Sequence, residues 1–209
     1  EKCVFSDILG QQNCDILKLT GVDTFTVRNC RFYNGAYDEN QGGDGAGIDM
    51  NGCHEGLIED SYFEYPGRFA LQTKGGCHKI TIRRNFFQAR PYIPTACERT
   101  VQIGGSHGGD FRPANANYNA KDIWVYSNIF SGGWAPIAFV GTVNSHVINN
   151  TFFRPEEWIM RILQEQTVSD IGTPLLPCGN NSFRNNIIYM GDLNIYGDLN
   201  VSYTNTNPG

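Results

Sequence analysis

Apolar residues return at a regular spacing along the chain, in copies of one short phrase. The copies read FTVRNCRF, GLIEDSYF, ITIRRNFF, IWVYSNIF, HVINNTFF and SFRNNII. We align them on one apolar column, Val27, Ile58, Ile82, Val125, Ile148 and Phe183, and on a second column five residues later, Phe32, Phe63, Phe87, Phe130, Phe153 and Ile188. Small or amide side chains lie between the columns and are expected to hydrogen-bond their equivalents in the next copy: Cys30, Ser61, Asn85, Asn128, Thr151 and Asn186.

A second apolar pattern precedes each copy and alternates with period two, as in a strand with one buried face. Its first inward column is Leu17, Ile48, Leu71, Val101, Ile137 and Met160, and its second, two residues later, is Leu19, Met50, Thr73, Ile103, Phe139 and Ile162. No pattern marks a helix long enough to cross a flat sheet. The repeat therefore predicts an all-β chain that winds in successive coils of two or three short strands.

The phrase V-x-N-N-x-F, read at residues 82–87 and 148–153, resembles the coil signature of right-handed parallel β-helix proteins of the pectate-lyase-like superfamily. The resemblance covers about residues 12 to 190. It implies a single-stranded right-handed parallel β-helix (a solenoid) of about six to seven coils, and a secreted or cell-surface protein. We expect one β-helix domain over residues 1–203 and a polar tail over residues 204–209. The superfamily hosts several reactions, so the fold does not name one.

Composition and charge exclude some classes of partner. The 209 residues include 24 glycines and carry a net charge of −5, without the basic face that nucleic acid requires. No apolar run approaches the ~18 residues of a membrane span. Because an open stack of coils exposes strand edges, we also expect a partner or a missing segment to cap the N-terminal coil.

Longer connections flank the second apolar pattern on both sides and predict the walls of a groove, although loops without a function are an alternative. The floor is expected over residues 48–51, 71–74 and 101–104. Its substrate-binding residues would be Asp49, Asn51, Gln72 and Gln102, with Arg161 further along and with Tyr92 and Trp134 as sugar-stacking faces. Such a mixture suits an elongated acidic glycan.

Lys74 is the candidate base of a polysaccharide lyase, which removes a proton next to a uronate carboxylate. Arg112 and His107 complete the predicted catalytic group, because a neighbouring cation favours the neutral amine. In the alternative, Lys74 is simply paired with Asp49, which lies diagonally across from it. Calcium held by Asp44 and Asp49 is a further expectation, since a flexible acidic loop suits a hard cation.

Two other functions stay open at this stage. A polygalacturonase-like hydrolase is suggested by the order of Gly47-Ile48-Asp49, Ser106-His107-Gly108 and Arg161-Ile162-Leu163, but Gln72 stands where an acidic pair would be needed. A non-catalytic glycan-binding, adhesin or spike module would need only the polar floor.

Seven cysteines occur, at positions 3, 14, 30, 53, 77, 97 and 178, with no paired zinc motif. Cys53 and Cys77 fall at equivalent positions of adjacent coils, each followed by a histidine. A disulfide between them, free thiols, and a metal site that includes His54 and His78 are the three alternatives.

Overall fold

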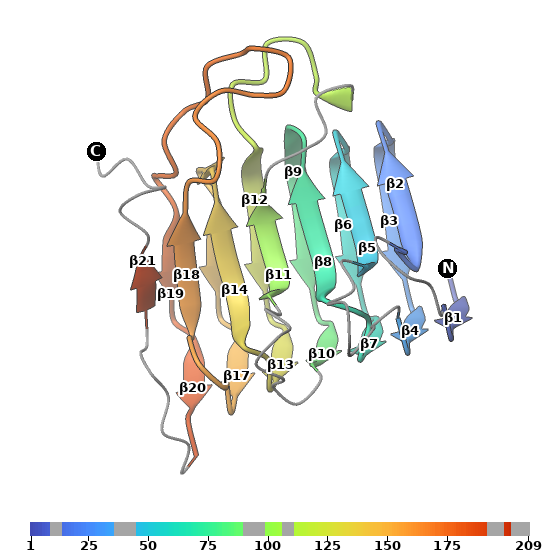
Figure 1. Ribbon diagram of the computed structural model, residues 1–209. Coiled ribbons are helices and arrows are strands. Elements are labelled where there is room, and N and C mark those ends of the chain that lie inside the picture. Colours follow the sequence, from blue (N-terminus) through green and yellow to red (C-terminus); the bar gives the residue numbers. More distant parts are fainter. Residues whose placement is uncertain (9–13, 36–44, 90–98, 106–110, 192–198, 202–209) are drawn as a thin grey trace.

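The computed structural model describes residues 1–8, 14–35, 45–89, 99–105, 111–191 and 199–201. These residues form no α-helix, and their strands assemble into three parallel sheets. The chain visits sheet A, sheet B and sheet C in turn and then returns to sheet A one strand further along (Figure 1). We call each such circuit a coil: β1 to β3 form coil 1, β4 to β6 coil 2, and so on to coil 6.

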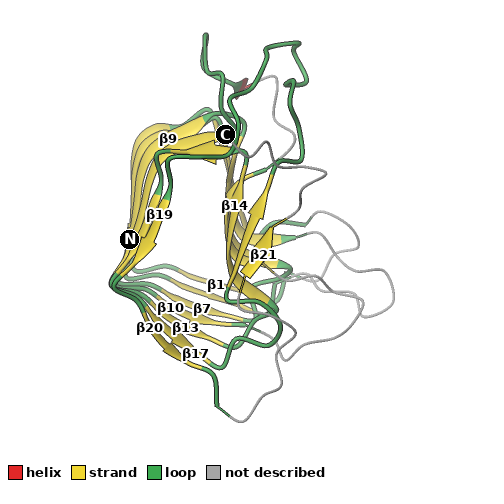
Figure 2. Ribbon diagram, turned by 90° about the vertical axis from the view of Figure 1, so that its left-hand side faces the viewer, coloured by secondary structure: helices red, strands yellow, loops and turns green. Residues whose placement is uncertain are grey.

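Each sheet takes one strand from every coil. Sheet A contains β1 (Val4–Ser6), β4 (Arg31–Tyr33), β7 (Tyr62–Glu64), β10 (Phe86–Gln88), β13 (Ile129–Ser131), β17 (Thr151–Phe153) and β20 (Ile187–Tyr189). Sheet B contains β2 (Leu17–Thr20), β5 (Ala46–Asn51), β8 (Phe69–Lys74), β11 (Arg99–Gly104), β14 (Ala135–Val140), β18 (Met160–Leu163) and β21 (Leu199–Val201). Sheet C contains β3 (Asp23–Arg28), β6 (His54–Glu59), β9 (Cys77–Arg83), β12 (Ala120–Tyr126), β16 (His146–Ile148) and β19 (Ser182–Arg184), with β15 (Thr142–Val143) beside β12. Viewed along the stack, the three sheets face one another around a common interior (Figure 2).

One aromatic column fills the interior under sheet A. Phe32, Phe63, Phe87, Phe130 and Phe152 are fully or almost fully buried, and neighbouring rings stack at centroid distances of 4.7 to 5.0 Å. This confirms the predicted column except in coil 5. There β12 pairs Val125 with Val147, and β13 pairs Phe130 with Phe152, so the prediction of Ile148 and Phe153 was wrong by one residue. Because a slip of one residue turns side chains to the opposite face, Phe153 is exposed while Phe152 is buried.

A column of buried polar side chains, which we call the asparagine ladder, follows the corner between sheets C and A. The backbone N–H of each member donates to the side-chain oxygen of the next, from Cys30 through Ser61, Asn85, Asn128 and Asn150 to Asn186, at 2.9 to 3.1 Å. The amide nitrogens donate back to carbonyls of the preceding coil. The predicted hydrogen bonding between coils is therefore confirmed, with Asn150 in place of Thr151.

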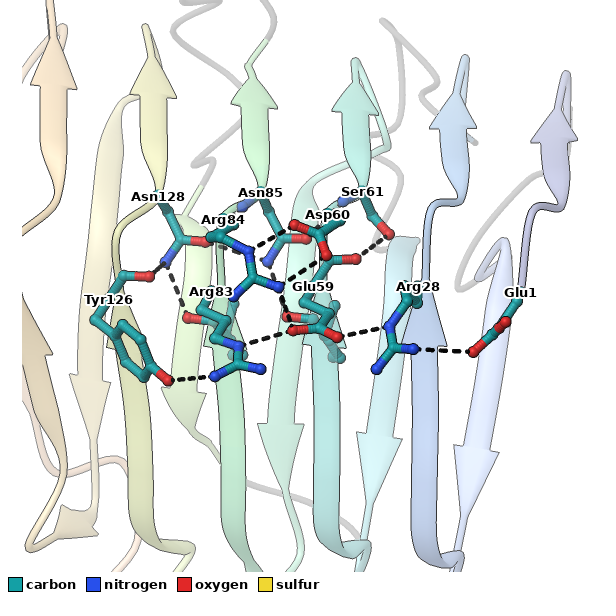
Figure 3. A network of polar contacts seen from close by, with 12 residues as sticks. Glu1, Arg28, Glu59, Asp60, Ser61, Arg83, Arg84, Asn85, Tyr126 and Asn128 are labelled. Carbon is teal, nitrogen blue, oxygen red and sulfur yellow. Dashed lines mark hydrogen bonds and ion pairs between the residues drawn. The ribbon is translucent and has the colours of Figure 1, made fainter.

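The outer face of sheet C carries a network centred on Glu59 (Figure 3). Its carboxylate, only 3% exposed, accepts from Arg28 at 2.6 Å and from Arg83 and Arg84 at 2.7 Å. The hydrogen bond from Arg83 is the main reason that the pKa of Glu59 lies below its usual range, with Arg28 acting in the same direction. Burying a carboxylate is tolerated here because three guanidinium groups satisfy it.

This network predicts a specific loss of stability in acid. The lowered folded-state pKa means that the contribution of Glu59 is complete above its unfolded pKa of about 4.3 and is lost as pH falls through the folded value. Glu59→Gln should remove this dependence, so the difference in unfolding free energy between the wild type and the variant shrinks below about pH 4. Urea unfolding between pH 2.5 and 7 measures it. Glu55→Gln, at the exposed pair with Lys79, is the control; an unchanged pH profile in Glu59→Gln would contradict the assignment.

The ends of the stack lie partly outside the described residues. The predicted domain limit at residue 203 and the tail over residues 204–209 fall there, and so does most of each connection from sheet A to sheet B in coils 2 and 4. The predicted cap of the first coil stays a prediction. No helix in the described part is long and apolar enough to cross a membrane.

Candidate functional site

The outward face of sheet B carries the polar row that the period-two pattern predicts. The parallel register places Lys18 beside Asp49, Asp49 beside Gln72, and Gln72 beside Gln102, and continues through Ala138 to Arg161. The row is more deeply buried than the floor of an open groove would be, since Asp49 is 1% and Gln102 2% exposed. The two lysines reach solvent to different extents: the Lys18 side chain is 44% exposed and the Lys74 side chain 12%.

Asp49 is the centre of this face, because two lysines share its carboxylate. Lys74 Nζ lies 3.1 Å from Asp49 Oδ2, and Lys18 Nζ contacts the same oxygen. The other oxygen, Asp49 Oδ1, is buried without a hydrogen-bond partner among the described residues. The diagonal contact predicted between Lys74 and Asp49 is therefore present. Lys18, however, supplies the second cation for which Arg112 was expected.

Asp15 completes a compact four-residue cluster of two cations and two carboxylates. Its Oδ2 accepts from Lys18 Nζ at 3.1 Å, and its Oδ1 accepts from the backbone N–H of Ala46 at 2.9 Å. Burial, together with the nearby charge of Asp49, raises the pKa of Asp15. Burial lowers the pKa of Lys18, but the hydrogen bonds and charges of Asp49 and Asp15 outweigh it and the net shift is upward. Lys18 is thus a firmly cationic group at the rim of the cluster.

Amide side chains extend the row beyond the charged cluster. Gln72 Oε1 accepts from Lys74 Nζ at 3.3 Å. Gln102 accepts from Arg99 at 2.5 Å, and Arg99 also pairs with Glu165 at 2.8 Å. Asn51 Oδ1 is buried with no partner among the described residues. Asp49 and Asn51 therefore present two unmet acceptors on one strand, a feature that suits hydroxyl donors.

Trp134 and Arg161 were predicted as binding residues, and the structure brings them into contact with each other. The Arg161 guanidinium lies 4.7 Å from the centre of the Trp134 ring, and the Trp158 ring meets Trp134 edge-on at 6.3 Å. Trp134 itself is 9% exposed, so only a small part of its ring is available for stacking on a sugar. Arg161 lies on β18, three strands or ~14 Å from the strand of Lys74.

Arg112 holds its own loop together. Its guanidinium donates to the backbone oxygens of Ala116 and Tyr118 and to Asn119 Oδ1, the last at 3.0 Å. Burial lowers its pKa. These contacts give Arg112 a structural role at the corner between sheets B and C. His107, Tyr92 and Asp44 lie outside the described residues, and their predicted roles stay predictions.

A small hollow opens beside the row, near the start of its strands. It is lined by Pro66, Gly67, Arg68, Ala70, Ala89 and Thr100, with ≈ 180 Å³ of empty space that includes open solvent. Thr100 Oγ1 is buried there without a partner among the described residues. The hollow is mostly apolar and contains none of the residues of the charged cluster.

The described residues do not by themselves form a metal site. No group of three or more His, Cys, Asp or Glu side chains in this part of the chain is placed to hold an ion. Asp49 fits calcium poorly, because both ammonium groups lie on its Oδ2. The expected calcium site therefore depends on Asp44, outside the described residues.

Comparison with known proteins adds little to this geometry. No protein-family model and no curated protein matches the chain. Among solved structures, the chain is similar to the crystal structure of an alginate lyase from Paenibacillus sp. str. FPU-7, with 12% sequence identity and a TM-score of 0.44 over 94% of this chain and 78% of that one. Likeness at this TM-score carries no argument about fold or activity, so a functional proposal depends on the residues of this chain.

Proposed function

We propose that the protein is a right-handed parallel β-helix that binds an acidic polysaccharide on the outward face of sheet B and cleaves it by β-elimination. The observation that supports this most is the shared carboxylate of Asp49, with Lys74 at 3.1 Å and Lys18 on the same oxygen. It places a lysine that can exchange a proton beside a second cation that can neutralise a substrate carboxylate. A secreted or cell-surface location belongs to the same proposal.

The four residues of the row have distinct roles in this mechanism. Lys18, the more exposed cation, pairs with the uronate carboxylate and stabilises the charge that develops there. Lys74, as the neutral amine, takes the proton next to that carboxylate. The electron pair forms the carbon–carbon double bond and the glycosidic carbon–oxygen bond breaks. The ammonium of Lys74 then supplies a proton to the leaving oxygen. Asp49 and Gln72 hold the Lys74 side chain in place.

Glycan binding without cleavage is the second candidate, and one observation favours it. Asp49 is almost completely buried and neutralises Lys74 directly, as in the alternative weighed from the sequence. A lysine that stays in this ion pair throughout would contribute to binding only. The hydrolase alternative gains nothing from the described residues, since the neighbour of Asp49 in the row is Gln72 rather than a second carboxylate.

Ultraviolet absorbance separates these functions. The purified protein is incubated with a panel of polyuronates, with and without calcium, and the unsaturated product is followed by its absorbance. We expect absorbance to rise on at least one polyuronate. Release of reducing ends without absorbance would contradict elimination and indicate hydrolysis, and binding without either product would indicate a glycan-binding module. Loss of the signal on chelation would support the calcium requirement.

A further inference from the structure

Two cysteines occupy the same position of successive coils, at the corner between sheets B and C. His54 pairs with His78 in the parallel register of β6 and β9, so Cys53 and Cys77, one residue earlier, are also neighbours. Equivalent residues of adjacent strands lie ~4.8 Å apart, inside the Cα separation of about 4.4–6.8 Å that disulfides require. The backbone N–H of Cys53 donates to Cys77 Sγ at 3.2 Å, which places that sulfur directly against Cys53.

Both thiols are completely buried, and their hydrogen bonds use only backbone carbonyls. Cys53 Sγ donates to Leu19 and Asn51, at 3.3 and 3.6 Å, and Cys77 Sγ donates to Met50 at 3.5 Å. No metal cluster involves them in the described part of the chain. The hydrogen bond from Cys77 lowers the pKa of Cys53 to about 7, whereas burial raises the pKa of Cys77 well above its usual value. Cys53 is therefore the thiol that ionises first and attacks a disulfide.

We propose that Cys53 and Cys77 are oxidised to a disulfide that joins coils 2 and 3 beside the charged row. The oxidant is a low-molecular-weight disulfide such as oxidised glutathione. The Cys53 thiolate attacks one of its sulfurs and releases a glutathione thiolate, leaving a mixed disulfide. Cys77 then loses its proton and attacks Cys53 Sγ, which releases the second glutathione. The protein gives up two hydrogen atoms, and the oxidant is reduced to two thiols.

The bond would fix the separation of two coils next to Asn51 and Lys74. Gly52 N–H already donates to the Lys74 carbonyl at 3.0 Å, and His78 N–H donates to the Cys53 carbonyl at 3.1 Å. The cross-link joins residues 24 apart in sequence, so it removes conformational freedom from the unfolded chain. We expect it to raise the melting temperature by about 5–10 °C and to slow amide exchange at Gly52 and His78.

Refolding in a glutathione redox buffer tests the proposal, since buried thiols of the folded protein react slowly. After alkylation and digestion, mass spectrometry should find the Cys53 peptide linked to the Cys77 peptide, with two hydrogen atoms fewer than the separate peptides. Cys3→Ser is the control, because Cys3 and Cys30 are the other neighbouring pair, through the Val4 to Arg31 register; it should leave the link intact. Folded wild type in which both cysteines are alkylated, or in which either is linked elsewhere, would overturn the proposal.

A stability measurement gives a second, independent reading. The melting temperature of the wild type should fall by about 5–10 °C when the disulfide is reduced, whereas that of Cys53→Ser should not respond to reductant. If Cys53→Ser does not fold, Cys77→Ala replaces it. A wild-type melting temperature that is equal in oxidising and reducing buffer would count against the cross-link, whatever the polysaccharide assays show.

Discussion

Asn150→Ala is expected to lower the free energy of unfolding by about 3 kcal/mol, because each buried backbone group left without a partner costs roughly 1–3 kcal/mol. The Asn150 side chain accepts from the backbone N–H of Asn128 and donates to the Val125 carbonyl, both at 3.0 Å. It also joins Asn186 in the next coil. Alanine removes these bonds at a site that is only 1% exposed, where water cannot replace them.

Thr151→Ala is the matched control for Asn150→Ala. Thr151 lies on the outward side of β17 and is half-buried, so its loss should change the free energy of unfolding by less than about 1 kcal/mol. Urea unfolding of both variants at neutral pH makes the comparison. If Thr151→Ala were the more destabilising substitution, the register of coil 5 described above would be wrong and the sequence-based alignment right.

Lys74→Ala is expected to lower the rate of β-elimination by about 10²–10⁴-fold, the range typical for loss of a general base. The variant keeps Lys18 on the Asp49 carboxylate, so binding of the polysaccharide should fall much less than turnover. Initial rates of ultraviolet absorbance at saturating polyuronate measure the effect, with circular dichroism to confirm that the variant is folded.

Lys79→Ala serves as the control for the loss of one positive charge in the same coil. Lys79 lies on the outer face of sheet C, where it pairs with Glu55 at 3.2 Å and is 60% exposed. Its substitution should leave the rate unchanged. Equal rates in the wild type and Lys74→Ala would remove Lys74 from the mechanism, and equal losses in both variants would show that overall charge matters rather than position.

The residues of the outward row could be predicted from the sequence because sheet B alternates strictly between inward and outward positions. Once Ile48 and Leu71 are aligned, the placement of Asp49 and Lys74 on one face follows from the period of two. Lys18 lies in the same column, but only its reach to Asp49 marks it as part of the site. Nothing in the spacing shows that reach, since it depends on side-chain conformation.

The slip in coil 5 has a clear physical origin. Val147 and Ile148 are both apolar, as are Phe152 and Phe153, and either pair fits a spacing of five. Apolar spacing alone cannot choose between the two registers. The buried amide could have chosen, since Asn150 continues the column of Asn85 and Asn128 whereas Thr151 breaks it. A polar residue that must be satisfied fixes register more sharply than one more apolar residue.

Arg112 shows the limit of sequence spacing for residues in long connections. Its place in a long connection after the row suggested a cation near Lys74, but its guanidinium folds back onto carbonyls of its own loop. A loop bonds to whichever partners its backbone brings near, and no repeat period constrains these. The Glu59 network was overlooked for a simpler reason, since the outward columns of sheet C were not considered for charge.

The mass of the cleavage products tests the proposed function most directly. The wild-type protein is incubated with a defined oligouronate, and the products are examined by mass spectrometry. Elimination predicts that the fragment from the non-reducing side of a new end carries an unsaturated sugar, one water lighter than the corresponding hydrolysis product. Fragments with the full mass of hydrolysis products, or an oligouronate that is bound and recovered intact, would contradict a lyase built around Lys74 and Asp49.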